Sequence, residues 1–483
     1  MDWSHYSERL FTEFIETDNN IIVQACPGAG KTTNIKHIWE LDNKPTVYLV
    51  FNKHNQLEAE GKMVSKDKSA VLTLNSLGHR AIMQAYGKVV LETNKVYKII
   101  RDEIFPSIPR GRRFNNHSEE SSKEKQEKIN ALQKAIGLLK MQCDIPSGNE
   151  LYSFLSHYDC DYYDGIQEHI EKVMNINDDM TNIIDFNDQI RFPVIHGLSM
   201  PQYHNVLVDE AQDLNVMQAM MIEGIGKRYV LVGDKRQAIY GFRGAMNDSM
   251  DILKDKFNCV ELPLKLTYRC AKNIVEEARF VFPNDIEALD TAQDGVVSSC
   301  DRDKQVYSSQ DALILCRNNK PLVEYAYKLL QRNIACFVRG RDIGLGLIRL
   351  IDRLEVSSVR HLIDRLEEWR CVEVAKASKR QNEQKIASVN DKADSLLIFI
   401  NRCSLDEEVN KVKENIESLF QEGKGICLST VHKAKGLEAE SAYILEPSLM
   451  PASYAQQVWQ QEQERNIKYV AVTRAKNALT YLI

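Results

Sequence analysis

Hydrophobic residues occur along the first half of the chain in short runs that alternate with polar, helix-like segments. Apolar runs of strand length are NIIV (20–23), TVYLVF (46–51), AVLTL (70–74), NVLVD (205–209) and YVLVGD (229–234). The connections between them read as helices, and continuous apolar runs of this length are typical of strands buried on both faces. The pattern predicts an α/β fold with a parallel sheet covered by helices.

A second α/β region is predicted from residue 259 onward. Its strand-like runs are VELPLKLTYR (260–269), DALILCR (311–317), ACFVRG (335–340), GICLSTVH (425–432), SAYILEP (441–447) and ALTYLI (478–483). We therefore expect two α/β lobes. The first lobe is expected to comprise residues 1–80 and 196–258, and the second to comprise residues 259–341 and 423–483.

A mainly helical interval interrupts each lobe. Residues 81–195 form the first, where Ile129, Leu132, Ile136 and Leu139 mark one helical face. Residues 342–422 form the second, which is charged and contains no pattern that carries chemistry. We interpret it as a small helical accessory subdomain, with a solvated connector as the alternative.

The stretch VQACPGAGKTTNIKHI (23–38) predicts a phosphate-binding loop between a strand and a helix. Gly28 and Gly30 let the backbone curl so that N–H groups point inward, and the helix adds its positive end. Lys31 is expected to reach the β- and γ-phosphates, and the Thr32 hydroxyl to bind Mg²⁺. The alternative is an ordinary small-residue turn. The order of strand, loop, Gly-Lys-Thr and helix favours nucleotide.

Two adjacent carboxylates, Asp209 and Glu210, follow the apolar run that ends VLVDEAQD. The carboxyl end of a parallel strand is where such sheets bind their ligands. Asp209 suits Mg²⁺ coordination, and Glu210 suits the general base that activates a water. A helix cap would be the alternative for an isolated pair, but the upstream phosphate loop favours the catalytic interpretation.

The segment VGDKRQAIYGFRGA (232–245) follows the next strand. Gln237 is placed to reach a γ-phosphate or its water. Tyr240, Phe242 and Arg243 offer flat or cationic surfaces for stacking on bases, although aromatic residues near a turn more often belong to the core.

Composition narrows the class of protein. Of the 483 residues, 43% are hydrophobic and 27% are charged, which is ordinary for a globular chain. The net charge of −6 argues against a general nucleic-acid coat but permits a local basic groove. The 11 cysteines include no C-x-x-C pair, so neither a zinc site nor a disulfide framework is supported.

The N-terminus, MDWSHYSERL, has no signal layout, and no apolar run is long enough to cross a bilayer. We expect a cytoplasmic protein with no membrane partner, and a nucleoid-associated or virus-encoded one is equally compatible.

Motifs in a fixed order resemble those of UvrD/Rep-type superfamily 1 DNA helicases. They are ACPGAGKTT, LVFNK, TLNSLG, DEAQD, GDKRQAIYGFRGA, LTYRC, STVHKAKGLE and KYVAVTRAK. The runs IIDFNDQIRFP and VRGRDIGLGL are similar to the family as well. The resemblance covers almost the whole chain and implies two RecA-like P-loop NTPase lobes, each with a mainly helical insertion.

The resemblance implies an ATP site with Mg²⁺. Its catalytic residues would be Lys31, Glu210, Gln237, Arg269 and Arg474. Phosphates and nucleoside would be bound by Ala25, Cys26, Pro27, Gly28, Ala29, Gly30, Lys31, Thr32, Thr33, Tyr268 and Glu438, and the metal by Thr32 and Asp209. In the family, such a site closes two lobes on ATP and lets them part on hydrolysis.

The resemblance also implies a nucleic-acid interface. Its residues would be Phe51, Asn52, Asn75, Ser76, Tyr240, Phe242, Arg243, Asn319 and His432. The chain departs from the family pattern at three places. Phe242 stands where tryptophan is frequent, Asn75 stands where histidine is frequent, and Glu8 and Arg9 stand where a glutamine that reads adenine is expected.

The implied function is an ATP-dependent DNA helicase that moves 3′ to 5′ on single-stranded DNA and unwinds tailed duplexes. The alternative is a nucleic-acid-stimulated ATPase that loads or displaces partners without processive unwinding. RNA as the main track stays open, because base stacking does not read the 2′-hydroxyl. Replication or repair proteins are possible partners, and the sequence does not identify the pathway.

Overall fold

The structure is a computed structural model. It describes residues 3–106, 118–158, 160–239, 249–305, 307, 312–379 and 382–483, with side chains described from residue 124 in the helix that begins at Ser118. The chain divides into two compact units. The first unit comprises Met1–Ala25 and Gly30–Leu264, and the second comprises Cys26–Ala29 and Lys265–Ile483.

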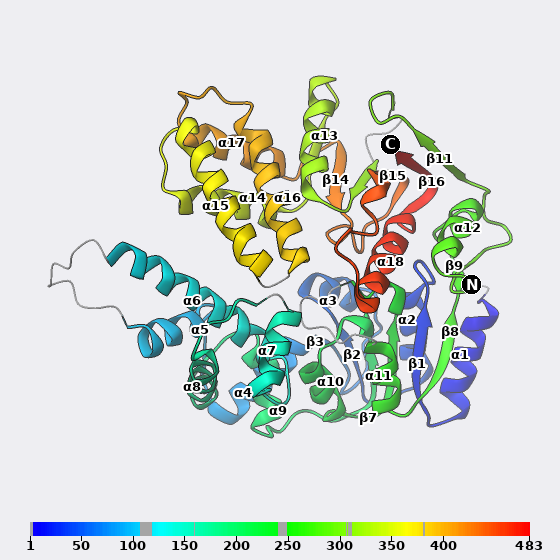
Figure 1. Ribbon diagram of the computed structural model, residues 1–483. Helices are drawn as coiled ribbons and strands as arrows, with labels where there is room; N and C mark the ends of the chain where they lie inside the picture. Colours follow the sequence, from blue (N-terminus) through cyan, green and yellow to red (C-terminus); the bar gives the residue numbers. More distant parts are fainter. Residues whose placement is uncertain are drawn as a thin grey trace. The chain divides into compact units, whose positions relative to one another are not determined.

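A parallel sheet forms the centre of the first unit (Figure 1). Within the described residues it has six strands in the order β3-β2-β6-β7-β1-β8, and every neighbouring pair is parallel. The strands are β1 (Asn20–Ala25), β2 (Thr46–Val50), β3 (Ala70–Thr73), β6 (Tyr203–Val208), β7 (Gly226–Gly233) and β8 (Cys259–Leu264). Each of the five apolar runs predicted in this region lies in one of these strands.

The central strands are buried on both faces. Ile22 of β1 packs in a core cluster with residues of α10 and α11, while Ile21 and Val23, which are fully buried, point to the opposite face. The helices that surround this sheet are α1 (His5–Glu16), α2 (Lys31–Leu41), α3 (Lys53–Glu60), α4 (Leu74–Tyr86), α9 (Asp188–Ile195), α10 (Val216–Glu223) and α11 (Ser249–Lys256). This double cover confirms the predicted α/β fold.

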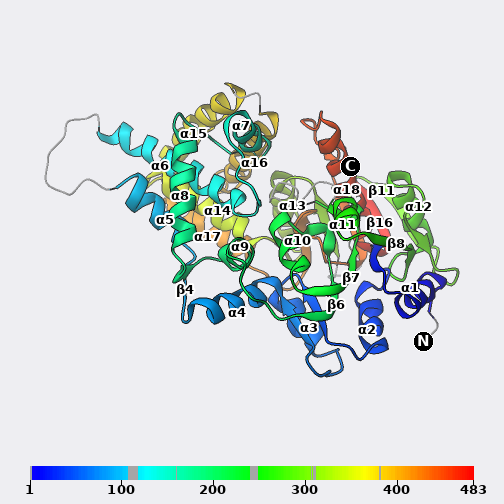
Figure 2. The same cartoon turned by 90° about the horizontal axis from the view of Figure 1, so that it is seen from below.

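The helices of the first interval form a bundle with its own core (Figure 2). They are α5 (Lys95–Ile99), continued by the π-helical turn Ile100–Ile104, and α6 (Ser118–Leu139), α7 (Gly148–His157) and α8 (Ile166–Asp179). A short parallel pair, β4 (Val90–Leu91) and β5 (Ile183–Ile184), joins the two ends of the interval. The apolar face predicted from the sequence is buried in this core, at Ile129, Leu132, Ile136 and Leu139.

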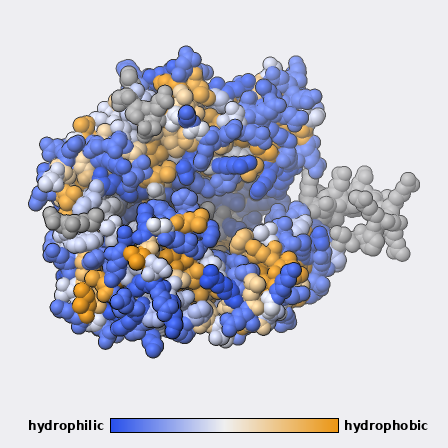
Figure 3. All heavy atoms as spheres, turned by 180° about the vertical axis from the view of Figure 1, so that it is seen from behind, coloured by the Kyte–Doolittle hydropathy of each residue, from blue (hydrophilic) through white to orange (hydrophobic). Residues whose placement is uncertain are grey.

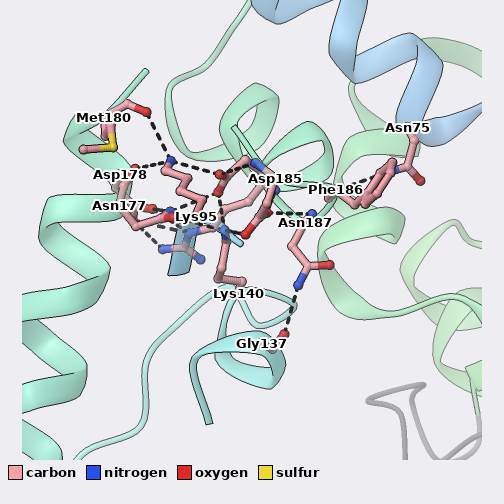
Figure 4. Close-up of polar contacts among 12 residues, drawn as sticks. Asn75, Lys95, Gly137, Lys140, Asn177, Asp178, Met180, Asp185, Phe186 and Asn187 are labelled. Carbon is pink, nitrogen blue, oxygen red and sulfur yellow. Dashed lines mark hydrogen bonds and ion pairs between the residues drawn. The ribbon is translucent and has the colours of Figure 1, made fainter. Parts of the chain in front are cut away.

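A buried network of charges connects the bundle to the segment that enters α9 (Figure 4). The Lys140 ammonium lies 2.5 Å from Asp188 Oδ1 and 2.6 Å from Asp185 Oδ2. The Lys95 ammonium lies 2.9 Å from Asp188 Oδ2. Burial alone would raise the pKa of Asp188, but the Lys140 and Lys95 ammonium groups hold it below its ordinary value. The Asn177 side chain bonds both Lys140 and Asp188, so the network is held from several elements.

The second unit contains another parallel sheet. Its described strands lie in the order β11-β16-β15-β12-β14-β13. They are β11 (Val296–Cys300), β12 (Leu313–Cys316), β13 (Cys336–Val338), β14 (Ile426–Thr430), β15 (Ala439–Leu445) and β16 (Ala475–Leu482). A separate short pair is formed by β9 (Leu266–Thr267) and β10 (Glu287–Ala288), and the flanking helices are α12 (Lys272–Val281), α13 (Asn319–Gln331) and α18 (Val458–Val472).

The charged interval of the second unit is packed structure. Its helices are α14 (Arg341–Leu354), α15 (Val359–Lys379), α16 (Glu383–Ile400) and α17 (Val409–Phe420). Leu362, Phe399 and Ile416 are fully buried and belong to one hydrophobic cluster with residues of α13 and β14. A solvated connector would not have such a core, so this alternative does not hold.

Two elements differ from the sequence prediction. The second lobe was expected from residue 259, but β8 (Cys259–Leu264) pairs with β1 and completes the sheet of the first unit. An apolar run shows that a strand exists but not which sheet it joins. The strand β11 (Val296–Cys300) was not predicted, because it lies at the edge of its sheet, its residues are exposed or half-buried, and two serines interrupt its apolar run.

The surface is mainly polar. The face drawn in Figure 3 is mostly hydrophilic, with hydrophobic residues in separate small patches. Across the described part of the chain, no helix combines the length and the apolar character needed to span a bilayer.

We predict that Lys140→Met destabilises the bundle by about 3–5 kcal/mol, because it leaves the buried Asp185 carboxylate without its cation and Asp188 with Lys95 alone. The matched control is Lys62→Met, which breaks an exposed Lys62–Glu58 pair of the same unit, and for which we expect about 0–1 kcal/mol. Urea unfolding, with hydrogen exchange at α6 and α8, measures both. Equal losses in the two variants would show that the buried network adds no stability.

Candidate functional site

The loop between β1 and α2 adopts the backbone that its glycines allow. Gly28 and Gly30 have φ values of 74° and 73°, in the left-handed region that other residues rarely adopt. Helix α2 begins at Lys31, and the Asn34 N–H makes the first helical bond to the Gly30 carbonyl at 2.9 Å. The N–H groups of the first turn, where Thr32 and Thr33 lie, therefore have no helical acceptor and are available for an anion.

The predicted carboxylates lie at the carboxyl end of β6. The Asp209 N–H continues the pairing with β2 by donating to the Leu49 carbonyl at 3.1 Å. Glu210 has a φ of 52°, a strained conformation for a residue with a side chain. This turn directs two consecutive carboxylates to the same edge of the sheet, where the phosphate loop also lies.

The Lys31 ammonium lies 2.8 Å from Glu210 Oε1. Burial alone would lower the pKa of Lys31, but Glu210, Asp209 and Asp234 raise it above its ordinary value. Lys31 therefore stays charged across the physiological range. The structure thus brings together the residue predicted to bind phosphate and the residue predicted to act as the base.

Two buried side chains hold the carboxylates in place. The Tyr48 hydroxyl donates to Asp209 Oδ2 at 2.9 Å, and the Glu210 N–H donates to Asp209 Oδ1 at 2.9 Å. The Gln212 amide donates to Glu210 Oε2 at 2.5 Å. Burial, followed by the nearby Asp209 charge, raises the pKa of Tyr48, so its hydroxyl keeps its proton as a donor.

Gln237 belongs to the same network. Gln212 Oε1 accepts a hydrogen bond from the Asp234 N–H at 2.9 Å, and the Gln237 amide donates to Asp234 Oδ2 at 2.6 Å. A chain of contacts therefore runs from Glu210 through Gln212 and Asp234 to Gln237. Burial raises the pKa of Asp234 to about 6, and the Glu210 charge adds to this effect.

The donor set fits a nucleotide-bound Mg²⁺. Burial and the Glu210 charge raise the pKa of Asp209, because two adjacent carboxyl groups lie beside a single ammonium, and a bound cation would favour its ionised form. Among the described residues, no group of three His, Cys, Asp or Glu side chains is arranged to hold a metal alone. A hydroxyl at Thr32 and a carboxylate at Asp209, completed by phosphate oxygens and water, is the set that Mg²⁺ prefers.

The tip of the phosphate loop packs within the second unit. The Thr267 hydroxyl donates to the Pro27 carbonyl at 2.7 Å, and the Tyr268 N–H donates to the Gly28 carbonyl at 2.9 Å. A Cβ on Gly28 would lie 2.5 Å from the Arg269 Cβ, so a side chain does not fit there. The Cys26 thiol also donates to the Lys265 carbonyl at 3.0 Å, while Ala25 and Ala29 are buried.

The remaining nucleotide residues also belong to the second unit. Arg269 Nε lies 2.7 Å from Glu438 Oε2, and the Lys476 ammonium lies 2.9 Å from Glu438 Oε1. Tyr268, predicted to stack on adenine, is 49% exposed. Arg474 is only 1% exposed and donates to the carbonyls of Val470 and Leu437. In this structure Arg474 therefore anchors backbone in the interior of its unit.

The described nucleic-acid residues predicted in the first unit are exposed or half-buried. Phe51 is 53% exposed, and Asn52 caps α3 by accepting from the Asn55 N–H at 2.9 Å. Asn75 donates to the Phe186 carbonyl at 2.8 Å and to Gln189 Oε1 at 3.0 Å (Figure 4).

Ser76 has a structural role in the same turn. Its hydroxyl and its N–H complete a reciprocal capping box with Thr73 at the start of α4. Its hydroxyl is therefore engaged in the cap at the N-terminus of α4.

The other predicted nucleic-acid residues lie elsewhere. Asn319 begins α13, and its side chain donates to Asp391 Oδ2 of α16 at 2.9 Å. His432 follows the carboxyl end of β14 and is half-buried. Tyr240, Phe242 and Arg243 lie outside the described residues.

Sequence reasoning missed several residues that the structure brings to these sites. Tyr48 looked like an ordinary strand residue, and Gln212 is the fourth letter of DEAQD, a position to which no role was given. Phe186 has a 54% exposed ring beside Asn75, and the signal for it was an aromatic residue between acids in IIDFNDQIRFP.

Comparison with known proteins agrees with these observations. The model of the UvrD/REP helicase N-terminal domain matches residues 9–258, and the model of the UvrD-like helicase C-terminal domain matches residues 354–483. Two parallel sheets in two domains are the two RecA-like lobes of such a protein.

Curated relatives carry similar names. The F-box DNA helicase 1 of Gallus gallus is 24% identical over 526 aligned residues, which cover 99% of this chain and 48% of the relative. The F-box DNA helicase protein 1 of Schizosaccharomyces pombe is 27% identical, covering 58% of this chain and 34% of the relative. The ATP-dependent DNA helicase Rep of Salmonella typhimurium is 21% identical, with coverages of 62% and 64%.

The chain spans less than two thirds of the length of these relatives, so their names describe longer proteins. The assignment to a family does not depend on these relatives. The N-terminal model alone matches more than half of the chain, and the residues it covers include the phosphate loop and the Asp209–Glu210 pair described above. The chain therefore belongs to the UvrD/REP helicase family.

Proposed function

We propose that this chain is an ATP-dependent DNA helicase that moves 3′ to 5′ along single-stranded DNA and unwinds tailed duplexes. The observation that carries the proposal is the 2.8 Å contact between Lys31 and Glu210, at the edge where the phosphate loop and β6 meet. A phosphate-binding ammonium and a half-buried carboxylate in contact form a site for phosphoryl transfer to water. Family membership supports DNA as the nucleic acid along which the protein moves and ATP as the nucleotide that it hydrolyses.

The side chains of the first unit have separate tasks in this proposal. Lys31 and the N–H groups of the first turn of α2 bind the phosphates. Glu210, oriented by the Gln212 amide, accepts the proton of the attacking water. Mg²⁺, when bound through Thr32 and Asp209, would neutralise charge on the phosphate oxygens. Displacing Lys31 from Glu210 frees this carboxylate to act as a base.

The Gln212–Asp234–Gln237 network gives the site a route to the segment that follows β7. The Gln237 amide is held by Asp234, which is itself bonded to the residue that orients Glu210. A change in the position of Glu210 therefore acts on Gln237 through three hydrogen bonds. We propose that this network transmits the change between the ATP-bound and nucleotide-free states from the ATP site toward the bound nucleic acid.

Exposed rings of the first unit suit a single-stranded track. Phe51 and Phe186 are each more than half exposed, and Asn75 holds the backbone of Phe186. Stacking of aromatic rings on bases tolerates any sequence, as a motor that moves along a strand requires. The 3′-to-5′ polarity comes from the family resemblance alone.

We predict that Glu210→Gln abolishes hydrolysis while nucleotide binding stays within a few-fold of the parent, because only the base is removed. Lys31→Ala should instead weaken nucleotide binding strongly, because it removes the phosphate contact. Steady-state ATPase and binding of a fluorescent ATP analogue separate the two effects. Hydrolysis at the parental rate in Glu210→Gln would exclude Glu210 as the base.

We predict that a duplex with a 3′ single-stranded tail is unwound and that one with a 5′ tail is not. Strand displacement with ATP measures this, with Lys31→Ala as the inactive control. Unwinding that requires a 5′ tail would reverse the proposed polarity. DNA-stimulated ATPase activity without displacement of either duplex would favour a protein that loads or displaces partners. ATPase activity that is stimulated by RNA but not by DNA would show that the protein moves on RNA.

A further inference from the structure

Tyr48 lies in the middle of β2, a strand whose five residues are all buried. Its side chain is only 1% exposed, and its neighbours Val47 and Leu49 belong to the hydrophobic core of the sheet. A phenol hydroxyl in such a place is costly unless it finds a hydrogen-bond partner. Its partners therefore show why a polar atom is tolerated there.

The Tyr48 hydroxyl contacts one of the two expected ligands of Mg²⁺. It lies 2.9 Å from Asp209 Oδ2. A carboxylate only accepts, so the Tyr48 hydroxyl donates its proton to Asp209.

This hydrogen bond has a fixed direction with a chemical consequence. Tyr48 donates to Oδ2 and the Glu210 N–H donates to Oδ1, so both Asp209 oxygens are held in one orientation and each keeps lone pairs for a cation. Tyr48 thus fixes a ligand that follows β6 from β2, the strand paired with β6.

We propose that Tyr48 is a positioning residue of the Mg²⁺ site, which orders the Asp209 carboxylate before the metal binds. This inference rests on the proposed function, because it assigns Mg²⁺–nucleotide to the same site. Loss of the hydroxyl should raise the Mg²⁺ concentration that is needed to promote nucleotide binding. Nucleotide binding in the absence of metal should stay unchanged.

The test is Tyr48→Phe, which removes one oxygen and keeps the ring that fills the core. Binding of a fluorescent ATP analogue is measured over a range of Mg²⁺ concentrations and in EDTA. We expect the Mg²⁺ concentration for half-maximal effect to rise about tenfold, as for loss of a hydrogen bond to a charged group. Affinity in EDTA should stay within about twofold of the parent, since the phosphate-binding groups are intact.

Tyr229→Phe is the matched control. Tyr229 is 6% exposed in β7, and its hydroxyl donates to the carbonyls of Glu223 and Gly226. Thermal unfolding should show a comparable loss of stability in both variants, because each removes one buried hydroxyl. Only Tyr48→Phe should shift the Mg²⁺ midpoint.

A double-mutant cycle gives a second measurement. In an Asp209→Asn background the effect of Tyr48→Phe on the Mg²⁺ midpoint should shrink, because the carboxylate that Tyr48 orders is gone. An unchanged midpoint in Tyr48→Phe, or an equal shift in Tyr229→Phe, would overturn the inference and leave the proposed function standing. Failure of the parent protein to bind nucleotide would overturn both.

Discussion

The arrangement of charge at the carboxyl edge of the first sheet constrains the rest of the site. Asp209, Glu210 and Asp234 all act on the Lys31 ammonium, and burial makes each ionised group costly unless a partner is near. The surrounding structure meets this requirement with fixed donors from Tyr48, Gln212 and Gln237. A site with adjacent carboxyl groups beside a single ammonium is also one that a cation and a phosphate can complete together.

The α/β architecture could be predicted because it depends on local pattern. Apolar runs such as TVYLVF and NVLVD became β2 and β6, and the phosphate loop lies between β1 and α2 as its glycines indicated. The proximity of Lys31 and Glu210 followed from a general rule, since both sit at the carboxyl edge of a parallel sheet. These strands, the phosphate loop and the proximity of Lys31 to Glu210 could therefore be predicted without knowledge of the strand order.

Tertiary context decided what local pattern could not. Strand β8 joins the first sheet because β1 offers it an edge, and Tyr48 has a polar partner only because β2 and β6 are adjacent. Arg474 was predicted from its motif as a charge for the nucleotide, yet burial and two backbone carbonyls hold it in the interior of the second unit. A motif gives the residue type at a position, whereas its exposure depends on packing.

The strand order also affects how the chain can fold during synthesis. Strand β1 emerges early, but its neighbours are β7 and β8, with Ile21 paired to Val230 and to Val260. At ribosomal rates, the strand that precedes the phosphate loop waits on the order of tens of seconds for its partners. The helical bundle of the first unit can form in that interval, because its contacts are closer in sequence. The nascent nucleotide site thus stays open, with an apolar strand exposed, until residue 264 has left the ribosome.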